Sequence, residues 1–509
     1  MTTQTLASYD QVPYLAKPLP QTHPSRLAAV ASMFGLSYVP PKAAKVLELG
    51  CASGVNLLGM AHFMPEAQFV GVDLSVVQIN EAQRRAKSIN ADNVTYHHMS
   101  IEDIGPDFGK FDYIIVHGIF SWVPESVQKA ILRICNENLS QDGIAFVSYN
   151  VQPGWRMKQA SRDVFMALTP PNMPPIQRHE YGIKWIKDAM ELTANDEKRP
   201  LLHQILANEL NDILTKRDVR YLVHEYLETH NDPILFREFL NHSFEAGLAY
   251  LGDAEPASMV RHIVDPRLRK FFQDHPAASM AEAEQSVDII SGRTFRQSLL
   301  VKGFRQAQIN RALNSNSFKN LYVQTRISKS TGDKGEITYS HAKLGKLNAN
   351  PPHGTAILEL LATEAHTPIS FKALAEKIFE SSQLQEDALG DVLFSLLGIG
   401  AIELFADPNI PTLSKGATPL ALIDMETGHN TTTNSFGEII ALDPFYALML
   451  PLLKGDWDRD AVIGQMQSMH LKGTFNIDPP PADEEQFKTV LGSIVDKAAA
   501  TLKHLGVVG

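Results

Sequence analysis

The stretch from Val46 to Gly54 constrains the fold more than any other part of the sequence. It reads Val-Leu-Glu-Leu-Gly-Cys-Ala-Ser-Gly, an apolar strand that ends in a glycine-containing turn, and a stretch with helical spacing of apolar residues follows it. Glycine lets the backbone turn sharply beneath a ligand and approach it closely. The pattern therefore predicts an α/β sheet that binds a ligand at the carboxyl end of its first strand.

Short apolar runs alternate with helical stretches as far as Asn150, which is typical of a parallel sheet covered by helices. An apolar, alanine-rich stretch from Pro24 to Phe34 predicts a further helix upstream. We expect a doubly wound, Rossmann-like α/β domain over residues 1–169. Its predicted strands are Lys45–Leu49, Gln68–Asp73, Val94–Met99, Tyr113–His117 and Ile144–Tyr149, and its predicted helices are Asn56–Phe63, Val76–Ile89 and Glu125–Leu139.

The rest of the chain divides into two regions. The proline-rich segment Pro170–Pro175 cannot continue a helix and predicts a linker. Residues 176–312 then show helical patterns without a competing strand pattern, as in Leu201–Lys216 and Pro233–Leu251, and predict a helical middle domain. In residues 316–509 three helical patterns and one strand pattern predict a winged-helix-like C-terminal region. These are Thr355–Ala365, Phe371–Phe379, Glu386–Leu397 and the strand Ala401–Phe405.

Charge and composition argue against several classes of protein. The net charge is −11, and the third predicted C-terminal helix carries Glu386, Asp387 and Asp391 but no Lys or Arg, so we expect no DNA binding. No window approaches 18 consecutive apolar residues and the first ten residues do not resemble a secretory signal, which predicts a cytoplasmic protein without membrane insertion. Two cysteines are too few for a disulfide framework or a thiolate metal site, and His97 and His98 face opposite sides of one strand, so no metal is expected.

The spacing of acidic residues around the turn selects a cofactor. Asp73 ends the second strand about 20 residues after Gly54, where a carboxylate accepts hydrogen bonds from a ribose diol. Glu48 ends the first strand, where it suits a cationic amino-acid ligand and would repel a pyrophosphate. Gly50 and Gly54 also depart from the spacing of a dinucleotide fingerprint. These features predict S-adenosyl-L-methionine, bound by Glu48, Gly50, Cys51, Ala52, Gly54, Asp73, Leu74, Ser100, Ile101, His117 and Gly118.

The ends of the fourth and fifth strands are expected to face the methyl group of that cofactor. His117 can act there as a base or can shape the pocket through one hydrogen bond. Trp122 is predicted either as core or as a wall of the substrate site. Asn150 and Trp155 are the substrate-side candidates, because amide oxygens and aromatic faces stabilise a cation without reacting with it.

Several further stretches resemble a known family. His224–Phe239, Gly247–Leu251 and Gly292–Leu300 resemble the methyltransferase regulatory domain of bacterial proteins, and His117–Val123 and Pro153–Trp155 resemble the catalytic domain that accompanies it. The best-known relatives are rickettsial protein-lysine methyltransferases that act on an outer-membrane protein.

That resemblance implies an S-adenosylmethionine-dependent enzyme that methylates lysine side chains of a protein partner. The residues themselves also allow a small-molecule or RNA methyltransferase, or a cofactor-binding regulatory protein with little turnover. Arg293 and Arg296 are expected to form ion pairs with surface carboxylates; the alternative is that they contact the substrate. The sequence makes no prediction of the oligomeric state.

Overall fold

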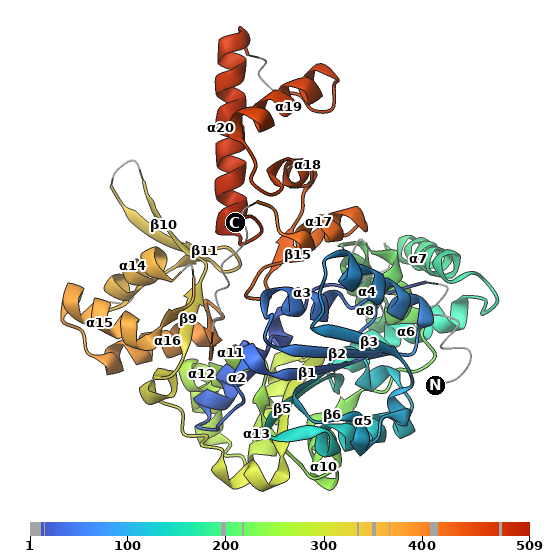
Figure 1. Cartoon of the computed structure of the whole chain (residues 1–509). Helices are drawn as coiled ribbons and strands as arrows, with labels where there is room; N and C mark the ends of the chain where they lie inside the picture. Colours follow the sequence, from blue (N-terminus) through green and yellow to red (C-terminus); the bar gives the residue numbers. More distant parts are fainter. Residues whose placement is uncertain are drawn as a thin grey trace.

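The computed structural model describes residues 12–14, 16–194, 200–215, 218–332, 335–348, 353–365, 367–407, 416–477 and 481–509. At its centre lies an eight-stranded sheet in the order β3-β2-β1-β4-β5-β8-β7, with the short β6 beside β5 (Figure 1). The first five strands run parallel, whereas β8 is antiparallel to both of its neighbours. The strands are β1 Lys45–Leu49, β2 Gln68–Asp73, β3 Val94–His98, β4 Phe111–Val116, β5 Leu139–Gln152, β6 Ile234–Leu235, β7 Leu248–Asp253 and β8 Phe295–Lys302.

Helices cover both faces of the sheet, because its strands are apolar on both sides. The helices α2 (Pro24–Met33), α3 (Val55–Phe63) and α4 (Val76–Ser88) pack on one face, which we call the α3 face. The helices α5 (Glu125–Glu137) and α10 (Phe236–Glu245) pack on the opposite face, the α5 face. The doubly wound fold class is thereby confirmed.

The expectation of helices alone across residues 176–312 is wrong, because β7 and β8 of this region complete the sheet. The pattern Pro233–Leu251 was expected as one helix, yet α10 ends at Glu245 and Gly247 takes a φ of +78° before β7 begins. All six residues of β7 are buried. A short, fully buried apolar strand lacks the alternation that distinguishes a strand from a helix.

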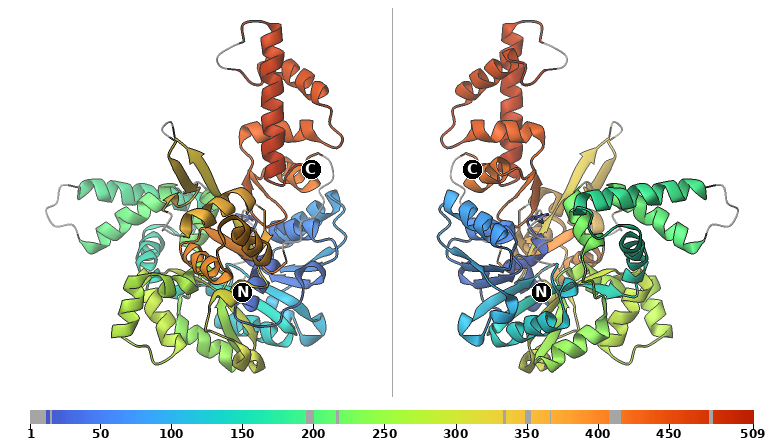
Figure 2. Two further views of the ribbon diagram at one scale, coloured as in Figure 1. Left: turned by 90° about the vertical axis from the view of Figure 1, so that its left-hand side faces the viewer. Right: turned by 90° about the vertical axis from the view of Figure 1, so that its right-hand side faces the viewer.

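A helical segment lies between β5 and the last strands of the sheet. It consists of α6 (Trp155–Leu168), α7 (Pro175–Leu192), α8 (Leu201–Thr215) and α9 (Val219–Leu227), with a small core of its own around Phe165 and Ile186. Figure 2 shows α7 and α8 projecting from the body as an arm. The helices α11 (Pro256–Val264), α12 (Pro266–Asp274) and α13 (Met280–Ser291) connect β7 to β8.

The region after β8 contains two bodies rather than one. The first shares the core of the α3 face and holds the expected three helices and strand. Its elements are β9 Tyr322–Thr325, β10 Ile327–Thr331, β11 Ile337–His341, β12 Gly345–Leu347, α14 Gly354–Glu364, β13 Ile369–Ser370, α15 Phe371–Ser382, α16 Glu386–Gly398 and β14 Ile402–Phe405. Its α16, the helix that would read DNA in a transcription factor, instead packs against α11 so closely that a Cβ on Gly398 would lie 2.4 Å from Val264.

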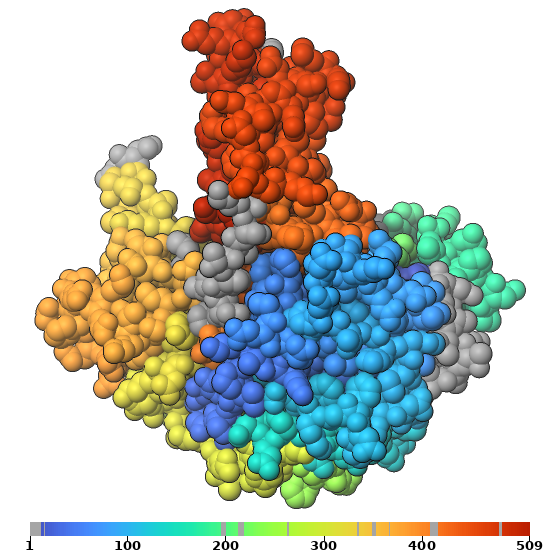
Figure 3. Space-filling model, in the orientation of Figure 1, coloured from blue at the N-terminus to red at the C-terminus, as the bar shows by residue number. Residues whose placement is uncertain are grey.

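The second body has a separate core and stands out from the surface (Figure 3). Its elements are α17 Pro419–Glu426, β15 Thr431–Thr433, β16 Ile439–Ala441, α18 Pro444–Met449, α19 Arg459–Leu471 and α20 Glu484–His504. A fully buried ion pair between Arg85 of α4 and Asp424 of α17 joins it to the sheet domain. Within the described residues, no helix combines the length and apolar character needed to cross a membrane.

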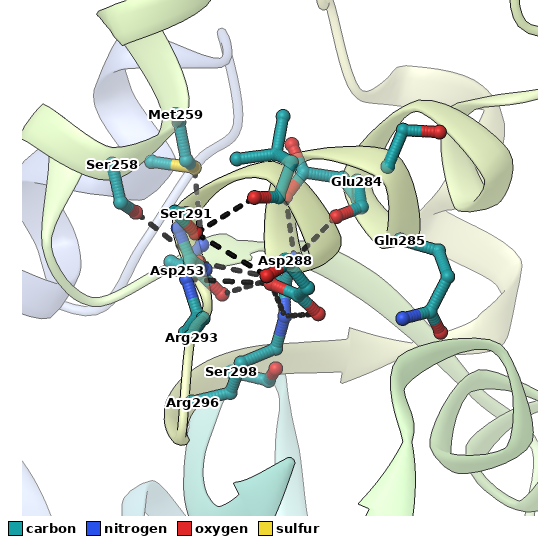
Figure 4. A network of polar contacts seen from close by, with 12 residues as sticks. Asp253, Ser258, Met259, Glu284, Gln285, Asp288, Ser291, Arg293, Arg296 and Ser298 are labelled. Atoms are coloured by element: carbon teal, nitrogen blue, oxygen red, sulfur yellow. Dashed lines mark hydrogen bonds and ion pairs between the residues drawn. The ribbon is translucent and has the colours of Figure 1, made fainter. Parts of the chain in front are cut away.

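A network of ion pairs anchors β8, which lies between β5 and the edge strand β7 (Figure 4). Arg296 is 1% exposed, and its guanidinium donates to Asp288 of α13 at 2.9 Å, to Asp253 of β7 at 3.1 Å and to Glu284 of α13 at 2.9 Å. Arg293 adds a contact of 2.7 Å to Asp253. The two arginines therefore pair with buried carboxylates, and the expected surface partners are wrong.

Replacing Arg296 by Leu leaves two buried carboxylates, Asp253 and Asp288, and the partly buried Glu284 with one fewer cation. We predict a loss of about 3–5 kcal/mol in the free energy of unfolding, measured by denaturant titration, since breaking a buried ion pair from one side strands the other charge. Arg459→Ala, which removes an exposed pair with Asp496, should leave the unfolding midpoint nearly unchanged. Equal effects of the two substitutions would contradict a stabilising role for the network.

Candidate functional site

The turn after β1 brings the backbone close to the carboxyl ends of the strands. Gly50 and Gly54 have φ values of +73° and +70°, and Ala52 between them has a φ of +47°. A Cβ atom on Gly50 would lie 2.4 Å from the Ile119 side chain, so a larger residue does not fit there. A Cβ on Gly54 would lie 2.6 Å from the Tyr96 ring, so both glycines are required by a close contact as well as by a left-handed conformation.

A pocket of about 680 Å³, open to solvent, lies beside this turn towards the α5 face. Asp73 lies at its edge and accepts hydrogen bonds from the main-chain N–H groups of Ala52 and Ser75, each at 2.9 Å. These bonds fix the carboxylate at the end of β2, where it can also accept from a diol. The predicted residues that line the pocket are Gly50, Asp73, Leu74, Ser100, Ile101 and Trp122, together with the apolar side chains of Met99, Ile119, Val123 and Val127.

Glu48 lies on the other side of the turn, on the α3 face, and is only 3% exposed. Its Oε1 accepts a hydrogen bond of 2.9 Å from Asn56 of α3, whereas its Oε2 is buried and has no partner among the described residues. Burial raises the pKa of Glu48 to about 8, although the bond from Asn56 opposes this shift. A buried carboxyl with one free oxygen is suited to receive an ammonium group.

His117 and Asn150 lie on the same α3 face, further along the sheet edge. His117 directly follows β4, and its ring centroid lies 5.9 Å from those of Phe146 and Phe295. Burial lowers the pKa of His117 to about 4, so the ring is neutral at neutral pH. His117 Nδ1 and Asn150 Nδ2 are buried, and neither bonds to any described part of the chain.

The two tryptophans predicted on the substrate side lie together; Trp122 lines the pocket, whereas Trp155 is only 4% exposed. Trp122 and Trp155 meet edge to face with ring centroids 6.2 Å apart, and Trp155 donates a hydrogen bond of 2.9 Å to Asn231. Lys158 lies 5.2 Å from the Trp155 ring centroid, and the Arg162 guanidinium lies 6.0 Å from that of Trp122. One face of each indole is thus covered by a cation of this chain, which holds the two rings in place.

The remaining predicted residues take supporting positions. The N–H of Gly118 donates to Ser148 Oγ at 2.8 Å, and Ser100 Oγ caps a short turn by accepting from the N–H of Glu102 at 3.3 Å. Cys51 is buried within the glycine turn, where burial raises the pKa of its thiol. Among the described His, Cys, Asp and Glu side chains, no group of three is arranged to hold a metal.

Asn56, Ser148 and Asn231 contact predicted site residues but were not expected from the sequence. Asn56 and Ser148 lie within segments that read as an ordinary helix and strand, and Asn231 lies in a loop 76 positions from its partner Trp155. A polar residue within an otherwise apolar run was the available signal for the first two.

Models of three known domain families match this chain. They are a methyltransferase domain over residues 46–143, a predicted methyltransferase regulatory domain over 218–302 and a PKMT C-terminal winged helix domain over 416–507. The uncharacterized protein RP789 of Rickettsia prowazekii (strain Madrid E) is 32% identical over 481 residues, which cover 89% of this chain and 84% of the relative. The uncharacterized protein RP028 of the same organism is 37% identical over 236 residues, 46% of this chain and 92% of the relative.

Among solved structures, PKMT2 from Rickettsia typhi is similar with a TM-score of 0.83 and 25% identity, covering 97% of this chain and 100% of that one. The same similarity holds for its complex with AdoHcy, the demethylated product of S-adenosylmethionine. The fold, the turn and these matches define an S-adenosylmethionine-dependent methyltransferase. Within that class, the chain belongs to the family of RP789, and its C-terminal body is a PKMT-type winged helix domain.

Loss of the Asp73 carboxylate should weaken cofactor binding. We predict that Asp73→Ala lowers the affinity for S-adenosylmethionine by about 1–3 kcal/mol, because hydrogen bonds to a charged group disappear. Calorimetric titration measures this, with the exposed Asp92→Ala as a control that should bind normally. Unchanged affinity in Asp73→Ala would remove this residue from the cofactor site.

The raised pKa of Glu48 predicts that cofactor binding releases a proton. Below about pH 8 the free protein holds Glu48 largely neutral, and an ammonium at its Oε2 favours the charged form, so binding lowers this pKa. Affinity should therefore rise between about pH 6 and 7.5, before the α-amino group of the ligand itself titrates. Binding enthalpies in buffers of different ionisation enthalpy report the proton, and Glu48→Gln should abolish its release. Proton release that persists in Glu48→Gln would assign it to another group.

Proposed function

We propose that this methyltransferase transfers the methyl group of S-adenosylmethionine to a lysine side-chain nitrogen of a protein substrate. Similarity to PKMT2 over nearly the whole of both chains carries the proposal, because it includes the regions that flank the site as well as the cofactor domain. The similarity of these outer regions favours a protein acceptor over a small molecule or RNA.

In this proposal the cofactor crosses the glycine turn. The pocket on the α5 side would hold its adenosine: Asp73 would accept from the ribose, and Leu74, Ser100 and Ile101 would contact the adenine. On the α3 side, the unpaired Oε2 of Glu48 would accept a hydrogen bond from the ammonium of the methionine portion. The residues present fit this ligand. The glycine turn, which has no room for a Cβ at Gly50, lies between the apolar pocket and the buried carboxyl of Glu48.

The chain supplies position and exclusion of water for the transfer. Bound S-adenosylmethionine would supply a methyl carbon on a cationic sulfur, which the amine lone pair would take up while the C–S electron pair stays on sulfur. A free lysine has a pKa near 10.4, so its ammonium must first lose a proton. His117 is too weak a base to retain that proton, and we assign its release to water. Asn150, Trp122 and Trp155 then hold the neutral amine in line with the methyl group.

Incubation with isotope-labelled S-adenosylmethionine and a bacterial lysate tests this function directly. After separation of protein, RNA and small molecules, we expect label in protein and, by mass spectrometry, on lysine. Label confined to RNA or metabolites would contradict the proposal.

The Trp155→Ala variant should lower kcat/KM for this transfer by roughly ten- to a hundredfold, because a displaced wall misplaces the nucleophile. Its affinity for the cofactor should stay close to that of the wild type. Trp457→Ala, which removes an indole from the C-terminal body, is the matched control.

A further inference from the structure

One polar side chain on the α3 face comes from outside residues 1–169, the predicted α/β domain. Gln297 lies on β8, within the stretch matched by the regulatory-domain model. Its main-chain carbonyl accepts from the N–H of Ala254, and its main chain pairs with β5, so the backbone needs nothing from its side chain. Its Oε1 is nevertheless buried, with no hydrogen-bond partner in the described parts of the chain. A buried amide oxygen left without a partner costs free energy unless a ligand satisfies it.

The strand register places Gln297 near Asn150, one of the predicted substrate-side residues. Gln297 lies opposite Ser148, and Phe295 lies opposite Asn150, in the antiparallel β5–β8 ladder. Side chains that face one another across such a ladder have Cβ atoms about 4.5–5.5 Å apart, and diagonal neighbours are about 7–8 Å apart. Ser148 and Asn150 share the α3 face with Phe146, whereas the intervening Tyr149 belongs to the core of the α5 face.

His117 closes this group from the other side. Its ring lies against Phe295 of β8 and Phe146 of β5, and the N–H of the next residue donates to Ser148 Oγ. Three side chains with a buried polar atom that lacks a partner among the described residues therefore lie on one face of adjacent strand ends: His117 Nδ1, Asn150 Nδ2 and Gln297 Oε1. Each belongs to a neutral group.

We infer that Gln297 is an acceptor-binding residue, whose Oε1 accepts one N–H of the neutral lysine amine. The inference rests on the proposed function and extends its site to β8. A neutral primary amine has two N–H donors and one lone pair. A hydrogen bond to Gln297 and one to a second acceptor in the same group, such as His117 Nδ1, use the donors and leave the lone pair for the methyl carbon.

The absence of a charge on this residue matters for the chemistry. A carboxylate at position 297 would favour the ammonium form and raise the pKa of the bound lysine, which would remove the nucleophilic lone pair at neutral pH. An amide oxygen orients the amine without stabilising its protonated form. The segment matched as a regulatory domain would thus contribute directly to the acceptor site.

Two substitutions at this position separate hydrogen bonding from charge. Gln297→Met keeps the length of the side chain but loses the acceptor, and should lower kcat/KM for lysine methylation of lysate protein roughly tenfold, with cofactor affinity unchanged within about twofold. Gln297→Glu should shift the pH dependence of kcat/KM to higher pH. Ser298→Ala, a buried neighbour on the opposite face of β8, controls for general disturbance of the strand and should leave the pH profile in place.

The outcomes distinguish this inference from the function on which it rests. Lysine methylation by the wild type, with undiminished kcat/KM in Gln297→Met or an unshifted pH profile in Gln297→Glu, overturns the role of Gln297 alone. A parallel loss of cofactor affinity in Gln297→Met also overturns it, since the residue would then act on the cofactor. A wild type that labels only RNA or small molecules overturns the proposed function and this inference together.

Discussion

The antiparallel pairing of β5 with β8 joins the parallel strands of the central sheet to its last two strands. It joins the cofactor-binding part of the chain to a strand that follows almost 150 residues later, and it extends from Ala145 opposite Leu300 to Asn150 opposite Phe295. Without it, the parallel strands would end at an open edge beside the site, with unpaired N–H and C=O groups. The helical arm and the helices α11–α13 are connections within one sheet rather than a domain beside it.

The ion network around Arg296 explains how such a distant strand is held in one register. Antiparallel ladders tolerate slippage where side chains do not specify the pairing. Here the guanidinium donates to Asp253 on the neighbouring strand and to Asp288 and Glu284 on the helix that precedes β8. These contacts are buried, so their directional geometry fixes β7, β8 and α13 relative to one another. A slip of one residue would turn Arg296 towards the α3 face and Gln297 away from it.

The first half of this arrangement could be predicted from the sequence. The glycine turn and Asp73 follow from local spacing, because strand, turn and helix are adjacent in the chain. The position of β8 could not be predicted in this way, because its partner β5 is distant in the sequence. The neighbouring β7 is buried on both faces and therefore lacks the alternation of apolar and polar residues that identifies a strand. The burial of Arg296 was hidden for the same reason: its three carboxylate partners come from other elements. The two bodies after β8 looked like one region, because a boundary between separate cores leaves no periodic signal.

We propose that the cofactor lies across the glycine turn, with its reactive end towards the α3 face. A crystal structure of the complex with S-adenosylhomocysteine tests this most directly. We expect the ligand ammonium within hydrogen-bond distance of Glu48 Oε2, the ribose at Asp73, and the sulfur directed towards His117, Asn150 and Gln297. A homocysteine portion that turns away from Glu48, with the sulfur remote from those three side chains, would contradict it.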